Sequence, residues 1–208
     1  MVLLVVSCDK YEVCWKPFFG LLKKYYPNHP KTYLVTESKK CPYCKTINVE
    51  GSWTQRLKKA LERLNDDVLI MLDDFFIRGP VDEERIKKLR LNEQIACFNF
   101  EQEHREPLIS LKEWDIQKNG QVYLNSCQPS LWNRKVLIDR LEGDKTPQEW
   151  ELTIIDSPYI HFINNKDLII DIGVKPYGWG ITGGKFTTEC LEFLESEGYD
   201  VKHNNPLL

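Results

Sequence analysis

The sequence predicts an α/β fold in a single domain, with a mostly parallel central sheet flanked by helices. Strand-like and helix-like segments alternate through the first half of the chain, which is the order expected of parallel strands joined by helical crossovers. The segment VLIML is continuously apolar, as in a sheet that is covered on both faces. With 208 residues, 42% of them hydrophobic, the chain has enough apolar material for one substantial core.

The first half of the chain accounts for most of the expected sheet. Runs of apolar and β-branched residues predict strands at 2–7, 32–36, 68–72 and 95–100. Apolar residues at helical spacing predict helices at 12–26, 54–64 and 82–91. Each of these helices lies between two strands, which is the arrangement of a parallel crossover.

The second half is less regular. The segment 101–131 is mixed in character and predicts no regular element. Helices are expected at 134–141, 147–155 and 187–197, and one further strand near 168–172. Because the chain shows no internal repeat, low-complexity segment or interdomain linker, we expect residues 1–208 to form one domain.

Charge and the N-terminal segment limit the possible partners. The formal net charge of −3 gives no field that attracts nucleic acid, so we expect no nucleic-acid partner. The apolar run MVLLVV is too short for a signal peptide or a membrane span, and no later stretch reaches the roughly 20 apolar residues of a spanning helix. We therefore expect no transmembrane segment and a cytoplasmic location, where the 7 cysteines are free thiols.

Polar or acidic residues follow three of the expected strands. They are Ser7 to Asp9, Thr36 to Glu37, and Asp73 to Asp74. In parallel sheets ligands bind beyond the carboxyl ends of the strands, so these positions are candidates for a site. The adjacent carboxylates Asp73 and Asp74 suit Mg²⁺ or Mn²⁺ bound together with phosphate oxygens. The same pair also suits a turn at a strand end, or a helix cap.

The helix expected at 54–64 carries a basic residue where a helix disfavours it. Thr54 is the expected N-cap and Trp53 lies just before it. Arg56 then falls in the first turn, where its charge opposes the helix dipole unless an anion such as a diphosphate is bound nearby. A solvated basic face of this helix is the alternative interpretation.

Two glutamates near residue 150 are the candidate catalytic carboxylates. Thr146 is the expected N-cap of the helix and Pro147 its first residue, so Glu149 stands at the capping-box position and already has a structural explanation. Glu151 follows Trp150, where partial desolvation favours a general base. An exposed helical glutamate is the alternative for Glu151.

The segment GVKPYGWGITGGKF is rich in glycine and aromatic residues. It lacks the spacing of a phosphate-binding loop, but a flexible loop of this composition can fold over a ligand, with Tyr177 or Trp179 as a shield. An irregular surface loop is equally consistent with it. The histidines are scattered; His161 or His203 can complete a metal site, although a structural or exposed role suits each better.

The segment KKCPYCKT contains a Cys-x-x-Cys pair, Cys41 and Cys44. Such a pair occurs in thiol redox proteins of the glutaredoxin type, where it lies at the start of a helix. Here KTINVEGSW follows, which predicts no helix. The pair is also half of a four-ligand zinc site, but the sequence has no second closely spaced pair of Cys or His. An insertion loop that closes on itself, or that binds metal adventitiously, is the interpretation we favour.

Four segments in this order resemble small bacterial glycosyltransferases of the GT-A fold that build surface polysaccharides. They are VVSCDKYEVCWKPFFGLLKKYYP, TYLVTE, SWTQRLKKALERLNDDVLIMLDDFFIRGPVD and QPSLWNRKVLIDRLEGDKTPQEWE. The resemblance spans most of residues 1–151. Its most specific part is the third segment, which joins a Trp-x-x-Arg-Leu helix, an apolar strand and the acidic pair. It implies a GT-A-like domain in which 1–100 bind a nucleotide sugar and 101–208 bind the acceptor.

The resemblance assigns roles to particular residues. Around the nucleotide sugar it implies Ser7, Asp9, Thr36, Glu37, Trp53, Arg56 and Asp73. Asp74 is then the first choice as metal ligand, with Asp73 as a second ligand that also lies near the ribose or the sugar. The family motif is Asp-x-Asp, whereas here Leu72 precedes the pair, so its first carboxylate is missing.

The resemblance also implies an activity. It is the metal-assisted transfer of a sugar from a nucleoside-diphosphate sugar, preferably a UDP-sugar, to a glycan or lipid-linked acceptor. The cofactor is Mn²⁺ or Mg²⁺. Glu151 is the base of an inverting reaction, and residues 128–132 shape the pocket. Peripheral association with the inner membrane face is compatible with such an acceptor. The alternatives are a non-catalytic protein that binds nucleotide sugars or polysaccharides, and a thiol redox protein that uses Cys41 and Cys44.

Overall fold

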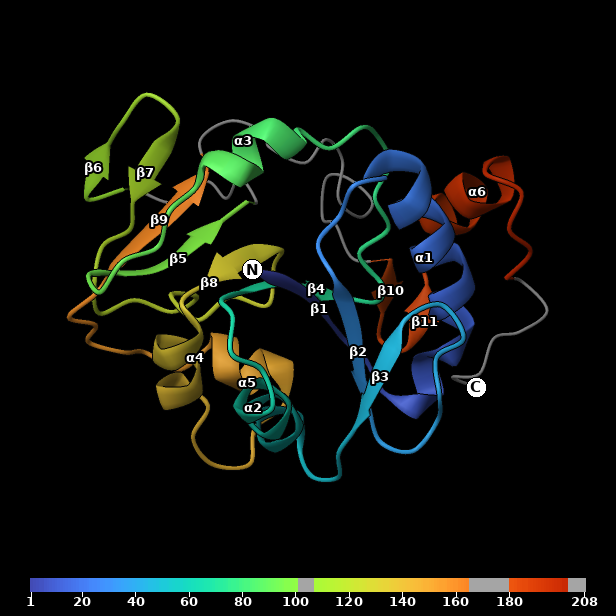
Figure 1. The fold of residues 1–208 in the computed structure, drawn as a ribbon, viewed down its shortest axis with the longest axis horizontal. Helices are drawn as coiled ribbons and strands as arrows, with labels where there is room; N and C mark the ends of the chain where they lie inside the picture. The colour runs from blue at the N-terminus through green and yellow to red at the C-terminus, as the bar shows by residue number, and fades with distance from the viewer. Residues whose placement is uncertain (101–106, 165–179, 202–208) are drawn as a thin grey trace.

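The fold is built on one large sheet. The computed structural model describes residues 1–100, 107–164 and 180–201, and in these ranges nine strands form a sheet in the order β3-β2-β1-β4-β8-β5-β9-β7-β6 (Figure 1). The strands are β1 (Val2–Val6), β2 (Thr32–Thr36), β3 (Lys45–Asn48), β4 (Val68–Leu72), β5 (Ile95–Asn99), β6 (Ile109–Ser110), β7 (Trp114–Ile116), β8 (Ser130–Trp132) and β9 (Ile160–Asn164). A separate hairpin consists of β10 (Ile181–Thr182) and β11 (Lys185–Phe186).

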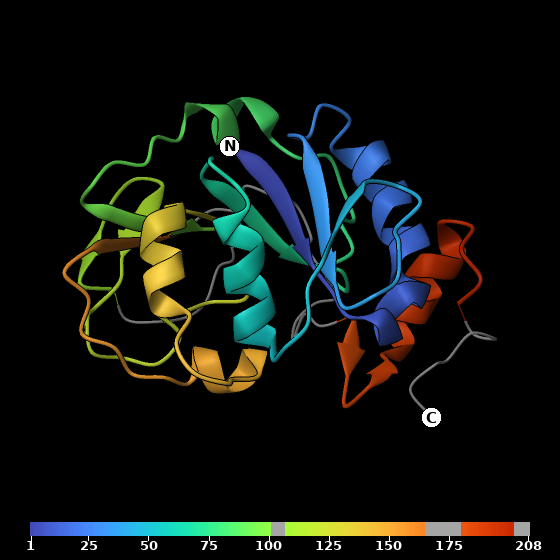
Figure 2. The same ribbon diagram turned by 60° about the horizontal axis from the view of Figure 1, so that its bottom comes forward.

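Helices lie on both faces of this sheet (Figure 2). They are α1 (Glu12–Tyr25), α2 (Trp53–Glu62), α3 (Glu83–Lys88), α4 (Arg134–Arg140), α5 (Pro147–Glu151) and α6 (Thr188–Ser196), with a short 3₁₀ helix at Asp9–Tyr11. The α/β fold predicted from the sequence is therefore confirmed.

The sheet is parallel in its first half and mixed in its second. Strands β3, β2, β1 and β4 pair in parallel, as expected from their helical crossovers. Strand β8 lies antiparallel between β4 and β5, and β7 lies antiparallel beside β9. The other strands of the sheet all run in one direction, so the prediction of a mostly parallel sheet is confirmed.

Side chains alternate between two cores because successive residues of a strand point to opposite faces. Leu3 and Val5 of β1 join a core with α1, α3 and α6, whereas Val2, Leu4 and Val6 join one with α2, α4 and α5. All five are buried, which explains why this strand has no polar residue. The result is a sheet between two layers of helices, with its central strands fixed on both sides.

Several elements differ from the sequence prediction. Strands β3, β6, β7, β8 and β9 were not expected, and α5 ends at Glu151, four residues earlier than predicted. The strand expected at 168–172 lies outside the described residues, as does the first half of the glycine-rich segment, 173–179. The end of that segment is the β10–β11 hairpin, where Gly183 and Gly184 have φ values of 57° and 78°. Glycine adopts these values without a steric penalty, so a tight hairpin replaces the expected loop.

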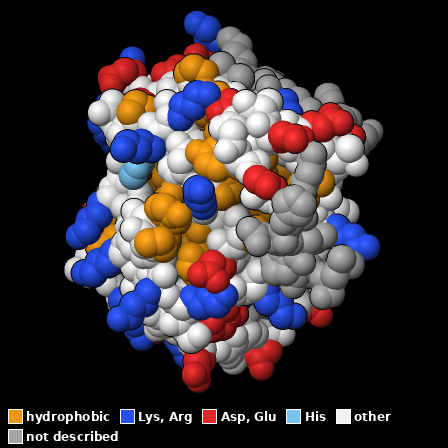
Figure 3. Space-filling model, turned by 90° about the vertical axis from the view of Figure 1, so that its right-hand side faces the viewer, with side chains coloured by type: hydrophobic (Ala, Val, Ile, Leu, Met, Phe, Trp, Pro, Cys, Tyr) orange, Lys and Arg blue, Asp and Glu red, His pale blue; other side chains and the backbone are white. Residues whose placement is uncertain are grey.

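The surface over α1 and α6 carries both signs of charge. Figure 3 shows hydrophobic side chains in the middle of this face, with basic and acidic side chains around them. In the described part of the chain, no helix has both the length and the apolar character that a bilayer crossing requires.

His161 of β9 is a buried histidine away from this surface. Its Nε2 lies 2.9 Å from Ser157 Oγ and its Nδ1 lies 3.5 Å from Cys97 Sγ. Desolvation, and then the charge of Arg140, lower the pKa of His161 to about 3. Its side chain is committed to these partners within the core, which supports the structural role.

We predict that His161 makes the protein sensitive to acid. His161 binds a proton more weakly in the folded chain than in the unfolded chain. The stability that neutral His161 contributes is therefore fully present above about pH 6.5, and it is lost as the pH falls toward 3. At pH 5 the loss is on the order of 2 kcal/mol. Urea unfolding at pH 7.5 and pH 5 measures it. The difference between the two pH values should shrink in His161→Gln and persist in His29→Gln, a partly exposed control; an unchanged difference in His161→Gln contradicts the prediction.

Candidate functional site

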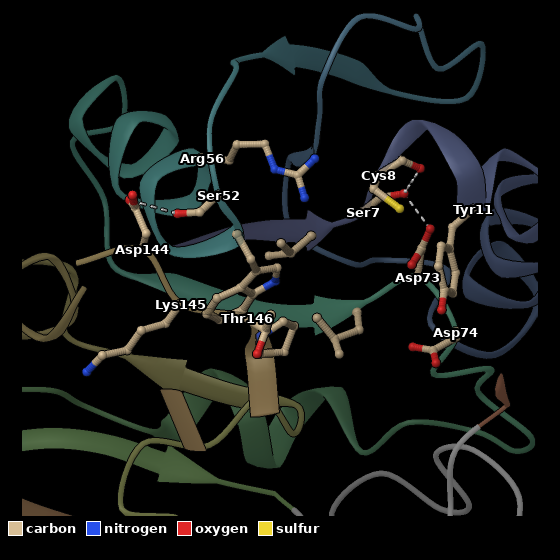
Figure 4. A pocket seen from close by; sticks show the side chains of 14 residues that line it. Ser7, Cys8, Tyr11, Ser52, Arg56, Asp73, Asp74, Asp144, Lys145 and Thr146 are labelled. Atoms are coloured by element: carbon tan, nitrogen blue, oxygen red, sulfur yellow. Dashed lines mark hydrogen bonds between the residues drawn. The ribbon is translucent and has the colours of Figure 1, made fainter. Parts of the chain in front are cut away.

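A cavity of about 420 Å³ lies at the carboxyl ends of β1 and β4 (Figure 4). Its walls come from the end of β1 with Tyr11, the start of α2, the end of β4, and residues 144–147 before and at the start of α5. In a parallel sheet this edge is where ligands bind. Ser7, Trp53, Arg56, Asp73 and Asp74, five of the residues assigned from the sequence, line the cavity.

Asp73 is held by the neighbouring strand. Leu72 of β4 pairs with Val6 of β1, so the residues that follow them, Asp73 and Ser7, lie side by side. Ser7 Oγ donates a hydrogen bond to Asp73 Oδ2, and Trp15 Nε1 donates to Ser7 Oγ at 2.8 Å. Asp73 is only 4% exposed, and its burial, followed by the charge of Asp74, raises its pKa well above the ordinary value.

Asp74 is the second buried carboxylate. It is 8% exposed, and desolvation raises its pKa to about 6. Tyr11 lies beside both aspartates (Figure 4), and its own burial, together with the charge of Asp74, raises the pKa of Tyr11 to about 12. The cavity therefore has an acidic end, where negative charge is costly unless a cation is bound.

Gly180 brings the C-terminal part of the chain against this acidic end. A Cβ atom added at Gly180 would lie 2.5 Å from the backbone oxygen of Asp74 and 2.8 Å from the ring of Phe76. Only glycine allows this close approach of two backbones. The last glycine before β10 thus has a packing role at the site, while Tyr177 and Trp179 lie outside the described residues.

Arg56 supplies positive charge to the same cavity. It lies in the first turn of α2, and its Nη1 forms an ion pair with Glu37 Oε1. Desolvation lowers the pKa of Arg56, although a guanidinium stays protonated under all ordinary conditions. Glu37 also accepts a hydrogen bond from the backbone N–H of Asp9 at 2.6 Å. The buried charge of Arg56 is thus compensated from the end of β2.

Asp9 and Thr36 support the cavity without lining it. Thr36 Oγ1 donates to Asp9 Oδ1 at 2.7 Å, Ser38 Oγ donates to Asp9 Oδ2 at 2.6 Å, and the backbone N–H of Lys39 donates to Asp9 Oδ1 at 3.1 Å. Burial raises the pKa of Asp9, but these hydrogen bonds outweigh it and lower the pKa to about 2. Of the residues assigned to the nucleotide, Asp9, Thr36 and Glu37 therefore form a second layer that fixes the loops after β1 and β2.

The prediction that Thr54 caps α2 is wrong. Ser52 is the N-cap, and it forms a capping box with Gln55, in which each side chain binds the backbone N–H of the other. Thr54 instead donates from Oγ1 to the backbone oxygen of Gly143 at 2.7 Å and accepts from the backbone N–H of Lys145 at 3.0 Å. Thr54 thereby ties α2 to the segment before α5.

That segment forms a wall of the cavity which the sequence did not indicate. Asp144 accepts a hydrogen bond from Ser52 Oγ at 3.4 Å (Figure 4). It accepts a second one from Gln55 Nε2. The Lys145 side chain points away from the cavity and donates to Thr153 Oγ1 at 3.1 Å. The contact between α2 and residues 143–146 joins segments about 90 residues apart, and no local pattern in the sequence marks such a contact.

The two candidate catalytic glutamates lie on α5 but not in the wall of the cavity. Glu149 forms the expected capping box with Thr146, whose backbone N–H donates to Glu149 Oε2 at 2.8 Å, and these hydrogen bonds lower the pKa of Glu149. Glu151 is 6% exposed, and its Oε1 accepts a hydrogen bond from the backbone N–H of Cys127 at 2.7 Å. The exposed alternative for Glu151 is therefore wrong.

Trp150 anchors α5 to the sheet. Its ring lies 5.4 Å from that of Trp53 and 6.1 Å from that of Trp132, and its Nε1 donates to the backbone oxygen of Arg140 at 3.0 Å. Trp132 itself is fully buried in β8. Residues 128–132, expected to shape the pocket, do not line this cavity; Trp132 lies behind it, where its ring packs at a tilt against that of Trp150.

The cavity also contains residues that the sequence did not single out as candidates. Besides Asp144 and Ser52 they include Tyr11, which lies beside the acidic end. Tyr11 belongs to a short 3₁₀ turn between β1 and α1, so its position depends on how that turn packs. The spacing of apolar residues does not reveal side chains presented by such a turn.

The acidic end fits a hard divalent cation. Within residues 1–100, 107–164 and 180–201, no three His, Cys, Asp or Glu side chains converge into a metal site. Two adjacent carboxylates at a strand end are nevertheless typical of Mg²⁺ and Mn²⁺ sites that take their other ligands from phosphate and water. Because Asp73 is engaged by Ser7, Asp74 is the better placed carboxylate for such an ion.

Comparisons with known proteins gave distant likenesses to solved structures. No protein-family model and no curated protein matches the chain. The galactosyltransferase LgtC in complex with donor and acceptor sugar analogs aligns with a TM-score of 0.47 and 14% identity, over 76% of this chain and 68% of that chain. An active-site mutant of LgtC gives 0.46 and 14% over the same shares. The bifunctional IspDF from Campylobacter jejuni gives 0.40 and 13%, over 76% and 50%. At this similarity the alignments carry no argument about function.

We predict that Asp74→Asn stabilises the ligand-free protein at neutral pH. The carboxyl group binds its proton more tightly in the folded chain than in the unfolded chain, so stability falls as the pH rises from about 4 through about 6. Removing the charge at pH 7 should raise the free energy of unfolding by on the order of 1–3 kcal/mol.

Urea unfolding at pH 4 and pH 7 measures this effect. The gain should appear at pH 7 and largely vanish at pH 4, whereas Asp139→Asn, which changes an exposed carboxylate on α4, should do little at either pH. A destabilised Asp74→Asn at pH 7 would show that the charge of Asp74 is satisfied within the ligand-free protein.

Proposed function

We propose that the protein is a glycosyltransferase that uses a nucleoside-diphosphate sugar, preferably a UDP-sugar, and transfers the sugar to a glycan or lipid-linked acceptor. The observation that carries the proposal is the composition of the cavity. It combines a buried pair of carboxylates, Asp73 and Asp74, with a buried guanidinium, Arg56, at the carboxyl ends of parallel strands. A metal-bound diphosphate carries a cation that the two carboxylates can bind and phosphate oxygens that Arg56 can bind.

The two carboxylates and Arg56 have different roles in the proposed donor site. Asp74, with Asp73 beside it, would hold Mn²⁺ or Mg²⁺, which supplies positive charge to the diphosphate when bound. Arg56 donates hydrogen bonds to phosphate oxygens, and its position at the start of α2 adds the partial positive charge of a helix N-terminus. Both contributions favour the negative charge that grows on the diphosphate as the sugar leaves.

Trp53 and Tyr11 supply the flat apolar surfaces of the proposed site. Both line the cavity, and aromatic rings stack on sugars and bases without requiring a particular hydrogen bond. Asp9, Thr36 and Glu37 act indirectly in this proposal, because their hydrogen bonds fix the loops after β1 and β2, and Glu37 also pairs with Arg56.

Glu151 is the proposed base that accepts the proton of the acceptor hydroxyl, which makes the reaction inverting. Its support is its burial and its place on α5, whose first residue, Pro147, lines the cavity. Glu149 is the other glutamate of this helix, and its carboxylate is committed to the cap.

A second candidate function is the binding of nucleotide sugars without transfer. It is favoured by the position of Glu151, which does not line the cavity. A protein that binds nucleotide sugars without transferring them needs Asp74 and Arg56 but no base. Both functions require donor binding, so a binding measurement does not distinguish them. Sugar transfer has to be measured separately.

We predict that UDP with Mn²⁺ raises the melting temperature by about 5–10 °C at a concentration near 100 times Kd. That saturation adds about 2.7 kcal/mol, and 1 kcal/mol corresponds to about 2–4 °C in a chain of this size. Differential scanning fluorimetry with UDP, GDP and dTDP, with and without Mn²⁺, measures the shift. Asp74→Asn should lose the metal-dependent part and Asp139→Asn should keep it. No response to any nucleotide would rule out the proposed donor site.

We further predict that Glu151→Gln lowers the rate of sugar transfer by about 100-fold or more, because a general base contributes that much. The variant should keep the melting shift with UDP and Mn²⁺. Glu149→Gln is the matched control, since glutamine also completes a capping box, and it should transfer sugar at a near-normal rate. Anomeric analysis of the product reports inversion. Equal rates in the two variants would remove Glu151 as the base, and binding without transfer in the wild type would favour the binding protein.

A further inference from the structure

The loop between β2 and β3 contains a pair of thiols that the proposed function does not use. Cys41 is buried, Cys44 is half-buried, and their sulfur atoms lie 3.9 Å apart. The backbone N–H of Cys41 donates to Thr46 Oγ1 at 2.8 Å, and the ring of Tyr43 stacks on Phe19 of α1 with centroids 5.6 Å apart. These contacts fix the loop at Cys41 and at Tyr43, and they leave the two sulfur atoms close together.

We propose that Cys41 and Cys44 are a redox modification site, at which a low-molecular-weight disulfide such as glutathione disulfide converts the two thiols into an intrachain disulfide. A disulfide needs sulfur atoms about 2.05 Å apart, so the pair has less than 2 Å to close. In a four-residue Cys-x-x-Cys loop, rotation of the two side chains covers that distance with little movement of the backbone.

The chemistry of the pair supports this reaction. The Cys44 thiol donates a hydrogen bond to the Cys41 sulfur, and this hydrogen bond lowers the pKa of Cys41 to about 7. Part of the pair is then thiolate at neutral pH, and the thiolate is the form that attacks a disulfide. The two thiols share this proton, so they act as one dithiol and not as two separate cysteines.

The reaction balances with glutathione disulfide as the oxidant. One protein thiolate attacks the disulfide, forms a mixed disulfide with one glutathione and releases the other as thiolate. The second protein thiol loses its proton, attacks the protein sulfur of the mixed disulfide and releases the second glutathione. The protein loses two electrons and two protons, and one glutathione disulfide becomes two glutathione molecules.

The loop also connects the pair to the cavity. The carbonyl oxygen of Lys39 accepts from Asn48 Nδ2 at 2.8 Å, while the backbone N–H of Lys39 binds Asp9. Glu37, two residues earlier, holds Arg56. Rotation of the Cys41 side chain changes the packing of the loop that carries these contacts. We therefore expect the oxidised protein to bind UDP with Mn²⁺ several-fold more weakly than the reduced protein. This expectation rests on the proposed function.

The test incubates the folded, fully reduced protein with an excess of glutathione disulfide at pH 7.5. Intact mass should fall by two hydrogens, and peptide mapping should locate one disulfide between Cys41 and Cys44, reversed by dithiothreitol. Cys44→Ser should instead keep one glutathione on Cys41, because no second thiol resolves it. The double variant Cys41→Ser/Cys44→Ser should show neither change. A wild-type protein that keeps all its thiols, or that stops at a stable glutathione adduct, would overturn the proposal.

A second measurement separates the disulfide from its effect on the cavity. Fluorimetric titration with UDP and Mn²⁺ should give a several-fold higher Kd for the oxidised wild type, and a Kd for the double variant that glutathione disulfide leaves unchanged. Equal Kd values for the two redox forms would overturn the coupling. If UDP binds neither form while the disulfide still appears, the donor site fails and the modification site stands.

Discussion

The parallel pairing of β1 and β4 is the constraint on which the site depends. Their register places Val6 opposite Leu72, so Ser7 and Asp73 leave the sheet as neighbours. Both strands are covered by helices on both faces, which keeps their ends rigid. The hydrogen bond from Ser7 to Asp73 then fixes the first carboxylate, and the chain turns at once to present the second. A one-residue shift of either strand would place a buried side chain where the cavity now begins.

The acidic end of the cavity is an unfavourable arrangement in the absence of a ligand. Burial raises the pKa of both aspartates, so the folded chain holds their charges at a cost in stability. Arg56 differs, because Glu37 already balances its charge. The positive and negative groups of the cavity are thus not paired with each other. A ligand that carries both a cation and an anion can engage both, which is why the account favours a metal-bound diphosphate over a neutral ligand.

The sequence predicted the part of the site that depends on local patterns. The apolar run before Asp73, the helical spacing after Trp53 and the Thr146–Glu149 capping box are all short-range signals, and the structure has each of them. The donor half of the cavity could be assigned from these signals because parallel strands end at one edge.

What the sequence did not predict depends on contacts between distant segments. Strand β8 has three residues and pairs antiparallel between β4 and β5, so no periodicity marks it and its neighbours alone decide its place. The wall at residues 144–147 depends on Thr54 and Ser52, about 90 residues earlier. Threonine favours the N-cap position, so the sequence predicts a cap at Thr54, but its hydroxyl binds the distant backbone of Gly143 and Ser52 is the N-cap. Burial of Glu151 also depends on a tertiary contact, with the backbone of Cys127.

The most direct test of the account is a crystal structure of the protein soaked with UDP and Mn²⁺, with anomalous diffraction data that locate the manganese. The account predicts one anomalous peak beside the Asp74 carboxylate, with the diphosphate of UDP between that peak and the guanidinium of Arg56. A peak away from Asp73 and Asp74, or UDP bound outside this cavity, would contradict it.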